Sequence, residues 1–195
     1  MSITLITPPA TEPVTLANAR GAIGITDAAD TSSDATITRH ITEAREWVEK
    51  HLQRSLITQT WKLRLDAWPS DGVIELPMGP VQSISSVTYT DTAGASQTVD
   101  SADYYLDSYS LQPNVRPAYS ESWPSARYFH DSIAVQYVVG YGAAAAVPGP
   151  IIHAIYRIIG HWIKFQPALE GGVTITRVPF AVEQMLEPYK LIKVA

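Results

Sequence analysis

The sequence contains no cysteine among its 195 residues. This absence excludes disulfide bonds, thiolate nucleophiles and zinc sites built on cysteine. The first residues, MSITLITPPATEP, have neither a basic region nor a long apolar core, so we expect no signal peptide. Charged residues are sparse at 17%, whereas hydrophobic residues make up 46% and supply enough apolar surface for a folded core.

Basic charge is scarce as well. The chain has 14 Lys and Arg residues against 19 Asp and Glu residues, and its formal net charge is −5. Binding of nucleic acid depends mainly on Lys and Arg at phosphates, so this balance argues against a protein that holds nucleic acid on a basic surface. The same balance is compatible with an acidic wall along which DNA slides without sticking.

Motifs for catalysis or metal binding are also missing. The sequence contains no Gly-x-Ser-x-Gly and no His-Glu-x-x-His. Residues 140–142, Gly-Tyr-Gly, lack the third glycine and the Lys-Ser/Thr of a phosphate-binding loop. His153 and His161 lie about 12 Å apart along one expected helix, which is too far to share a metal ion. We therefore expect no enzyme, no metal site and no cofactor, and we expect His130 to lie in a loop.

The stretch from Pro148 to Gln166 has the clearest periodicity. Its apolar residues recur at intervals of four and three on one line of an expected helix, and further apolar residues form a second line beside it. Because this arc is wider than a surface stripe, we expect other elements to pack around the helix. The charges on its polar side favour a core helix over a membrane span. The first line is Ile151, Ile155, Ile158, Trp162 and Phe165; the second is Ile152, Ile159 and Ile163; the polar line is His153, Arg157, Gly160 and Lys164.

Three further helices are expected. Thr15 is a suitable N-cap for a short helix over 16–23, and Ser33 or Asp34 can cap a second helix over 34–53. A last helix is expected over 179–190. The segment before the first helix, 1–14, is rich in proline and is expected to form an extended N-terminal arm. The apolar residues of this arm lie against its own chain or against a neighbour; they are Ile3, Leu5 and Ile6.

Residues 58–142 follow the period of β-strands. Alternating apolar residues predict strands over 61–65, 73–76, 81–90, 97–99, 104–107 and 133–139, with a bulge between Ile84 and Val87. The segment 108–131 is expected to be a long loop with room for one short strand. Local hairpins would make the sheet antiparallel. The pattern predicts an α+β fold in which a bundle of about four helices, 15–57 and 143–195, is interrupted by an antiparallel β-rich insertion, 58–142.

Aromatic residues cluster between positions 104 and 128. Tyr and Trp are common at protein interfaces, because they bury a large area at a low cost in side-chain entropy. They can equally pack the edge of the chain's own sheet, so the pattern leaves both interpretations open. The residues are Tyr104, Tyr105, Tyr109, Tyr119, Trp123 and Tyr128.

Several segments, in order along nearly the whole chain, resemble one family. They are LITPPATEPVTLANAR, REWVEKHLQRSLITQTWKLRLDAWP, IELPMGPVQSISSVTYTD, DYYLDS, YSESWPSAR, SIAVQYVVGYG, VPGPIIHAIYRIIGHW and PFAVEQMLEPYK. The most specific are SLITQTW, ELPMGPVQSISSVTY and VPGPIIHAI. On these segments the chain resembles the head–tail connector, or adaptor, proteins of long-tailed bacteriophages, related prophages and gene-transfer particles. None of the segments is a catalytic signature.

The resemblance implies a structural virion protein of the neck, assembled in the host cell cytoplasm. It implies a helical core with a β-rich insertion, and a homo-oligomeric ring, commonly a dodecamer, docked beneath the portal protein. The ring would extend the DNA channel and receive the next neck or tail-completion protein. Double-stranded DNA would pass through it during genome ejection without specific binding. Catalysis, cofactors and membrane contact are not implied.

The candidate interface residues follow from the arm, the aromatic cluster, the polar line of the long helix and the C-terminal lysines. The alternative function is a tail-associated accessory domain that binds a ligand or carbohydrate through the aromatic residues of 104–128, which predicts a concave aromatic pocket. The candidates for a subunit or partner interface are Ile3, Leu5, Ile6, Tyr109, Tyr119, Trp123, Tyr128, His153, Arg157, Gly160, Lys164, Lys190 and Lys193.

Overall fold

The structure, a computed structural model, describes residues 1–27, 29–110, 112–165 and 180–191. Its helices and antiparallel sheets make a mixed α+β fold, as the sequence predicted. The chain divides into two compact units. The β unit comprises Met1–Ala10, Thr58–Tyr141 and the chain from Leu191, and the helical unit comprises Thr11–Ile57 and Gly142–Lys190.

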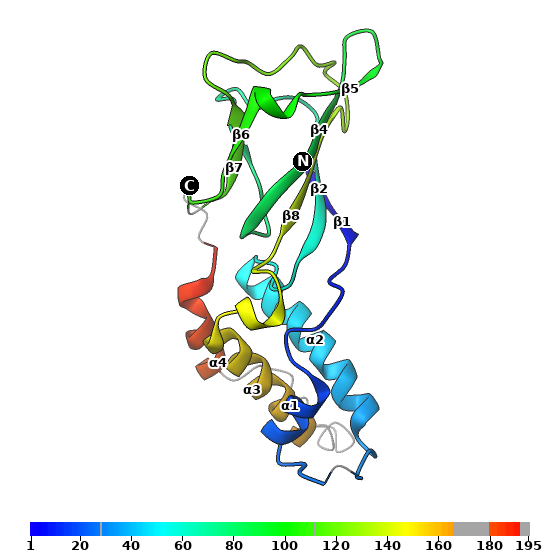
Figure 1. Ribbon diagram of the computed structural model, residues 1–195, viewed down its shortest axis with the longest axis vertical. Coiled ribbons are helices and arrows are strands. Elements are labelled where there is room, and N and C mark those ends of the chain that lie inside the picture. The colour runs from blue at the N-terminus through cyan, green and yellow to red at the C-terminus, as the bar shows by residue number, and fades with distance from the viewer. Residues whose placement is uncertain (28, 111, 166–179, 192–195) are drawn as a thin grey trace. The chain divides into compact units, whose positions relative to one another are not determined.

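The helical unit contains four described α-helices (Figure 1). The first begins after Thr15, whose hydroxyl oxygen accepts a hydrogen bond from the Asn18 N–H at 3.2 Å, so the predicted N-cap is confirmed. The second begins after Ser33, whose side chain makes no capping bond. The predicted last helix ends as a 3-10 turn, η4. The bounds are α1 Leu16–Ala22, α2 Asp34–Leu52, α3 Gly149–Phe165, α4 Phe180–Leu186, η2 Ala144–Ala146 and η4 Glu187–Tyr189.

Helix α3 is the central element of the helical unit. It contacts α1, α2 and α4, as its wide apolar arc predicted (Figure 1). Ile151, Ile155 and Ile158 on its first apolar line are fully buried. Trp162, further along this line, is half-buried and lies against His40 of α2, with the ring centroids 5.6 Å apart. Among the described residues, no helix is both long and apolar enough to cross a membrane.

A charged network is buried between α2 and the segment that precedes α1. The Arg45 guanidinium donates to Glu12 at 2.9 Å and to Glu49 at 2.7 Å, and the side chains of Arg45 and Glu49 are each only 8% exposed. Glu49 also accepts the Leu56 N–H at 2.8 Å. Burial lowers the pKa of Arg45, but the negative charges of Glu49 and Glu12 outweigh this effect and raise that pKa above its ordinary value. The network therefore ties two segments to helix α2: the segment around Glu12, which precedes α1, and the turn at Leu56, which follows α2.

The β unit contains two antiparallel sheets. The larger sheet has the strand order β1-β2-β8-β4-β5, and the smaller one has the order β3-β7-β6. The predicted strands are all present, and the expected loop 108–131 contains the short strand β7. The bounds are β1 Ser2–Thr7, β2 Gln59–Leu65, β3 Ile74–Glu75, β4 Val81–Thr90, β5 Ser96–Thr98, β6 Tyr104–Asp107, β7 Asn114–Pro117 and β8 Ile133–Val139, with a 3-10 turn η1 Ser101–Asp103.

The pairing of the larger sheet is mostly non-local. The hairpins β4–β5 and β6–β7 are local, as expected, but β8 lies between β2 and β4, and β1 pairs with β2. The register of β4 against β8 shifts between Val81 and Ser83 and again between Ile84 and Ser86. The second shift confirms the bulge predicted from the broken alternation in this strand.

Both sheets contribute to the core of the β unit. Leu63 and Val135 of the larger sheet and Ile74 and Val115 of the smaller one belong to the same buried cluster. Tyr137 of β8 is fully buried, and its hydroxyl donates to the Pro77 carbonyl at 3.1 Å. Burial raises the pKa of this phenol well above its ordinary range. The alternation predicted for 133–139 is therefore confirmed, with Ile133, Val135, Tyr137 and Val139 all buried.

Candidate interaction surfaces

Strand β1 forms one edge of the larger sheet (Figure 1). The predicted arm therefore lies along its own chain, because Ile3 pairs with Leu63 and Leu5 pairs with Trp61 of β2. The edge of β1 that faces away from β2 has no strand beside it among the described residues. All six residues of β1 are exposed, including Ile3 at 38%, Leu5 at 40% and Ile6 at 43%.

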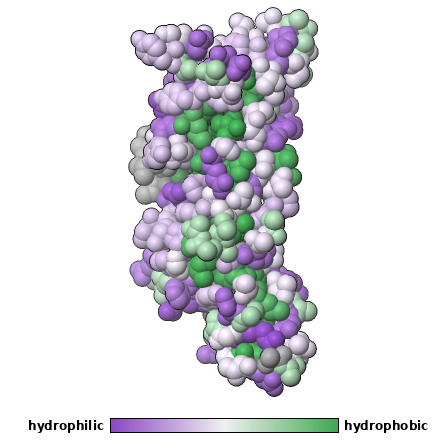
Figure 2. Space-filling view, in the orientation of Figure 1, coloured by the Kyte–Doolittle hydropathy of each residue, from purple (hydrophilic) through white to green (hydrophobic). Residues whose placement is uncertain are grey.

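The apolar residues of β1 continue the core layer of the sheet outward. The row that begins at Ile3 runs through Leu63 and Val135 to Val87, and these three partners are fully buried. Exposure therefore rises abruptly at the last strand, where the core layer is left uncovered. Apolar atoms are visible in Figure 2 at the margin where Figure 1 places β1. We call Ile3 and Leu5, with the free backbone edge beside them, the β1 shelf.

Exposed aromatic residues occupy the loops of the β unit. Tyr109 and Tyr119 are each 99% exposed, Tyr128 is 85% exposed and Phe129 is 67% exposed. Phe129 was not among the residues singled out from the sequence, although it directly follows Tyr128. Large aromatic side chains in contact with water on this scale are typical of surfaces that another molecule covers.

Trp123, by contrast, packs inside the β unit. Its ring stacks on Trp68 with the centroids 4.6 Å apart, and its indole N–H donates to the Gly72 carbonyl at 2.8 Å. Tyr104 lies beside the same ring at 6.4 Å. The Trp68 indole N–H in turn donates to the Pro124 carbonyl at 2.8 Å. The aromatic cluster is thus divided: Trp123 and Tyr104 pack against the chain itself, whereas the tyrosines at the loop tips face solvent.

We predict that Trp123→Ala lowers the free energy of unfolding by about 2 kcal/mol, because it removes a stacked, half-buried ring and leaves the Trp68 face open. Tyr119→Ala is the matched control and should change the free energy of unfolding by less than about 0.5 kcal/mol, since an exposed side chain has little to lose. Denaturant unfolding of both variants measures the difference. Equal effects in the two variants would contradict the packing of Trp123 inside the β unit.

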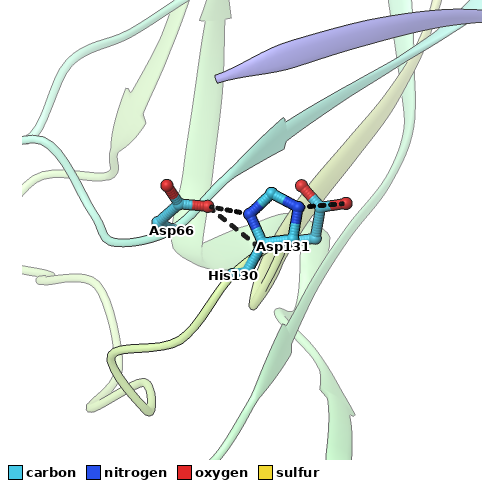
Figure 3. A group of neighbouring side chains, drawn as sticks. All are labelled: Asp66, His130 and Asp131. Atoms are coloured by element: carbon cyan, nitrogen blue, oxygen red, sulfur yellow. Dashed lines mark hydrogen bonds and ion pairs between the residues drawn. The ribbon is translucent and has the colours of Figure 1, made fainter.

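Asp66, His130 and Asp131 form a charged group at the base of the loop that carries Tyr128 (Figure 3). The His130 ring lies between the two carboxylates, with Nδ1 3.3 Å from Asp66 and Nε2 3.7 Å from Asp131. Asp66 also accepts the Asp131 N–H at 3.0 Å, and Arg64 lies 3.4 Å from the Asp131 carboxylate.

This group is the candidate metal site of the described residues, since its ligand atoms lie within 4.8 Å of one another. Imidazole and carboxylate are suitable ligands for divalent metals. The guanidinium of Arg64, however, already supplies positive charge to one carboxylate. We therefore interpret the group as an ionic clasp that fixes the loop. The sequence alone did not predict this group, because Asp66 and Asp131 are 65 positions apart.

The hydrogen bond from the Asp131 N–H is the main reason why the pKa of Asp66 is lowered, and the charges of the N-terminus and His130 add to it. A lowered pKa in the folded state contributes stability above the pKa of the unfolded state, and this contribution is lost as the pH falls through the folded pKa. We predict that an NMR titration of Asp66 gives a pKa below that of an unfolded peptide. His130→Ala should retain most of this lowering; complete loss in that variant would assign the cause to the imidazole instead.

The polar line of α3 is only partly exposed. His153, Arg157 and Lys164 are exposed, whereas Gly160 is half-buried. A Cβ atom at Gly160 would lie 3.7 Å from Ile23, so this position faces the end of α1 in the same chain. Lys190 pairs with Glu187 at 3.5 Å, and Lys193 lies outside the described residues. The interface role of these residues stays a prediction.

No protein-family model and no curated protein matches the sequence. Solved structures do share its fold. A chain in the neck of an empty gene transfer agent (GTA) particle, determined with C6 symmetry, matches with a TM-score of 0.81 at 19% identity, over 100% of this chain and 98% of that one.

Two further structures agree with this comparison. A chain of the native GTA virion matches with a TM-score of 0.81 at 18% identity, and a chain of the native GTA neck determined with C12 symmetry matches with a TM-score of 0.79 at 18% identity. Each match covers 100% of this chain and 98% of the other. The structural neighbours of this chain are therefore neck proteins of a GTA particle, and the likeness extends over both units.

Proposed function

We propose that this chain is a structural protein of a phage-like virion, a head–tail connector that forms a ring beneath the portal. The observation that carries the proposal is the match of the whole chain to a chain of the GTA neck, with a TM-score of 0.81. In this role the ring extends the DNA channel of the filled head and receives the next neck or tail-completion protein. Catalysis has no part in the proposal.

A ring of identical copies suits the surfaces of this chain. The necks of the structural neighbours were determined with C6 and C12 symmetry, which supports a ring and is compatible with a dodecamer. A ring closes through heterologous contacts, in which one patch of a copy meets a different patch of the next. The β1 shelf and the exposed tyrosines are distinct surfaces of the β unit that can serve such contacts.

The charge of the chain suits a passage for DNA. With a net charge of −5, the protein lacks the basic excess that holds phosphates, so double-stranded DNA can pass without specific binding. Tight binding in a channel would stall ejection. A strongly basic channel wall in the assembled ring would contradict this part of the proposal.

The exposed tyrosines do not support a carbohydrate-binding function. An aromatic side chain that lines a concave pocket is partly covered by the opposite wall of the pocket. Tyr109 and Tyr119, however, are each 99% exposed. Trp123, which could otherwise serve as a stacking platform, is stacked on Trp68. The connector function is therefore the one that these contacts favour.

The test is native mass spectrometry of the purified chain, alone over a range of concentrations and mixed with the portal protein of the same particle. We expect a ring-sized oligomer that binds the portal. Deletion of the gene should abolish particles that are both filled with DNA and tailed. A chain that stays monomeric under all conditions, with or without portal, would refute the proposed function.

A further inference from the structure

The β1 shelf is an unusually open edge for a β-sheet. Strand β1, SITLIT, contains no charged residue and no proline, and all six residues are exposed. Proteins normally protect such edges with charges, prolines, bulges or covering segments, because free backbone N–H and C=O groups recruit other strands. The bulge between Leu5 and Thr7 interrupts only the end of β1, so Ser2 to Leu5 pair regularly with β2. The edge can therefore accept a further strand as long as this regular stretch.

The two faces of β1 define what the added strand must carry. On the core face, Ile3 and Leu5 continue the layer of buried residues, so apolar side chains beside them would extend this layer by one strand. On the outer face, Thr4 pairs with Lys62, and the neighbouring pair on this face adds the cation of Arg64. The occupant should thus alternate apolar and polar residues, and acidic groups suit its polar face.

Strand β6 is an edge of the smaller sheet and has this pattern (Figure 1). It contains four residues, Tyr104–Asp107, and pairs only with β7 among the described residues. Tyr104 and Leu106 are half-buried and pack against the core cluster of the β unit. Tyr105 points to the opposite face, where its side chain is 48% exposed. Strand β6 is therefore apolar on one face over the same length as the regular part of β1.

The charges beside β6 are complementary to those beside β1. Asp107 ends the strand on the same face as Tyr105, and the exposed Asp100 and Asp103 lie at the turn that precedes it. Arg116, the cation nearest this face, belongs to β7, one strand further from the edge, and its guanidinium lies over the Tyr105 ring at 5.9 Å. An edge with three carboxylates close by suits the two cations that lie one strand in from the edge of β1.

We propose that the free edge of β1 in one copy pairs with the free edge of β6 in the next copy, so that a β-sheet runs from each subunit of the ring into its neighbour. The contact is heterologous, because two different edges meet, and repeated contacts of this kind can close a ring. This inference rests on the proposed ring function, and it names the segments that join the copies.

The match of the faces determines which residues lie opposite one another. When apolar residues are placed beside apolar residues at the greatest overlap of the two strands, Thr4 lies opposite Tyr105. This holds whether the strands run parallel or antiparallel, because both residues are flanked on each side by residues of the core face. One pair of positions therefore tests the contact in both directions.

The other edges of the two sheets fit less well. Pairing of β1 with β1 of a second copy would be isologous, would close a dimer instead of a ring and would bring like charges together. Strand β5 ends the larger sheet, but its three residues, Ser96–Thr98, are all polar and cannot extend the apolar layer. Strand β3 ends the smaller sheet and has only two residues, Ile74–Glu75, which is too short to cover the β1 shelf.

The absence of native cysteine makes disulfide cross-linking a clean test. The test variant combines Thr4→Cys with Tyr105→Cys, and both positions are exposed, so the chain should stay folded. Opposite residues of paired strands lie about 4.5–5.5 Å apart between Cα atoms, which is within the range of a disulfide. Native mass spectrometry records ring formation before oxidation, in preparations concentrated enough to assemble.

We expect oxidation of the ring to give a ladder of covalent oligomers on a denaturing gel. The matched control, Thr4→Cys with Thr98→Cys, places the second cysteine on the exposed edge strand β5 and should give no ladder. A ring without a ladder, a cross-link confined to the monomer, or dimers from Thr4→Cys alone each overturns the inference while leaving the connector function standing. If the unsubstituted chain forms no ring, the connector function itself is refuted.

Hydrogen exchange of the unsubstituted chain tests the same contact without any substitution. Backbone amides on the free edges of β1 and β6 should exchange more slowly in the ring than in the monomer, because they gain hydrogen bonds to the next copy. Amides of β5 serve as the internal control and should exchange at the same rate in both states. A ring in which β1 and β6 exchange as fast as in the monomer overturns the inference.

Discussion

Arg45→Ala is expected to lower the free energy of unfolding by about 3–5 kcal/mol, because it leaves a buried carboxylate without its partner. Glu49 is the carboxylate concerned: its side chain is only 8% exposed, and Arg45 lies 2.7 Å away. The substitution also removes the 2.9 Å contact between Arg45 and Glu12, so that Glu12 keeps the Thr42 hydroxyl as its contact with α2. The segment before α1 and the turn after α2 should therefore loosen together.

Urea unfolding followed by circular dichroism measures this loss. Arg39→Ala is the matched control on the same helix, since its pair with Glu43 is 3.6 Å long and the two side chains are 61% and 47% exposed. That variant should lose no more than about 1 kcal/mol. Adding Glu49→Gln to Arg45→Ala should recover part of the loss, because the amide keeps an oxygen for the Leu56 N–H without a buried charge. An Arg45→Ala variant as stable as Arg39→Ala would show that the network is not a structural support.

Sequence periodicity was sufficient to predict most elements of this fold, although β1 was expected only as part of an extended arm. Strand β4 and strand β6 begin and end where the sequence pattern predicted, and Ile151, Ile155 and Ile158 of α3 are buried where the intervals of four and three placed them. Side-chain direction repeats every two residues in a strand and about every 3.6 residues in a helix, so a single buried face is visible in the sequence. The Thr15 cap is equally local, since its bond reaches only to Asn18.

The contacts between distant segments could not be predicted in this way. Arg45 meets Glu12 across 33 positions, and Asp131 meets Asp66 across 65. Periodicity identifies the face of each strand but not its neighbour, which is why the placement of β8 between β2 and β4 was not foreseen. The division of the aromatic cluster has the same origin, because the stacking of Trp123 on Trp68 depends on where two loops meet.

Leu5→Lys is expected to abolish ring assembly while the chain stays folded. Leu5 is 40% exposed, so the lysine can extend into solvent in the isolated chain at little cost in stability. In a ring joined through the β1 shelf, the same lysine would be buried against the next copy. An unpaired buried charge costs about 3–5 kcal/mol, which corresponds to a weakening of each contact by roughly a hundredfold to several thousandfold.

The comparison with Thr98→Lys makes this prediction specific. Thr98 lies on β5, the other exposed edge of the same sheet, so a lysine there adds the same charge to a comparable strand. Rings should form in Thr98→Lys and be absent in Leu5→Lys at equal concentration, as measured by native mass spectrometry. Circular dichroism should show the same secondary structure in both variants. If Leu5→Lys assembles as readily as Thr98→Lys, the copies are joined elsewhere, and the exposed line of α3 with His153 and Arg157 becomes the surface to substitute next.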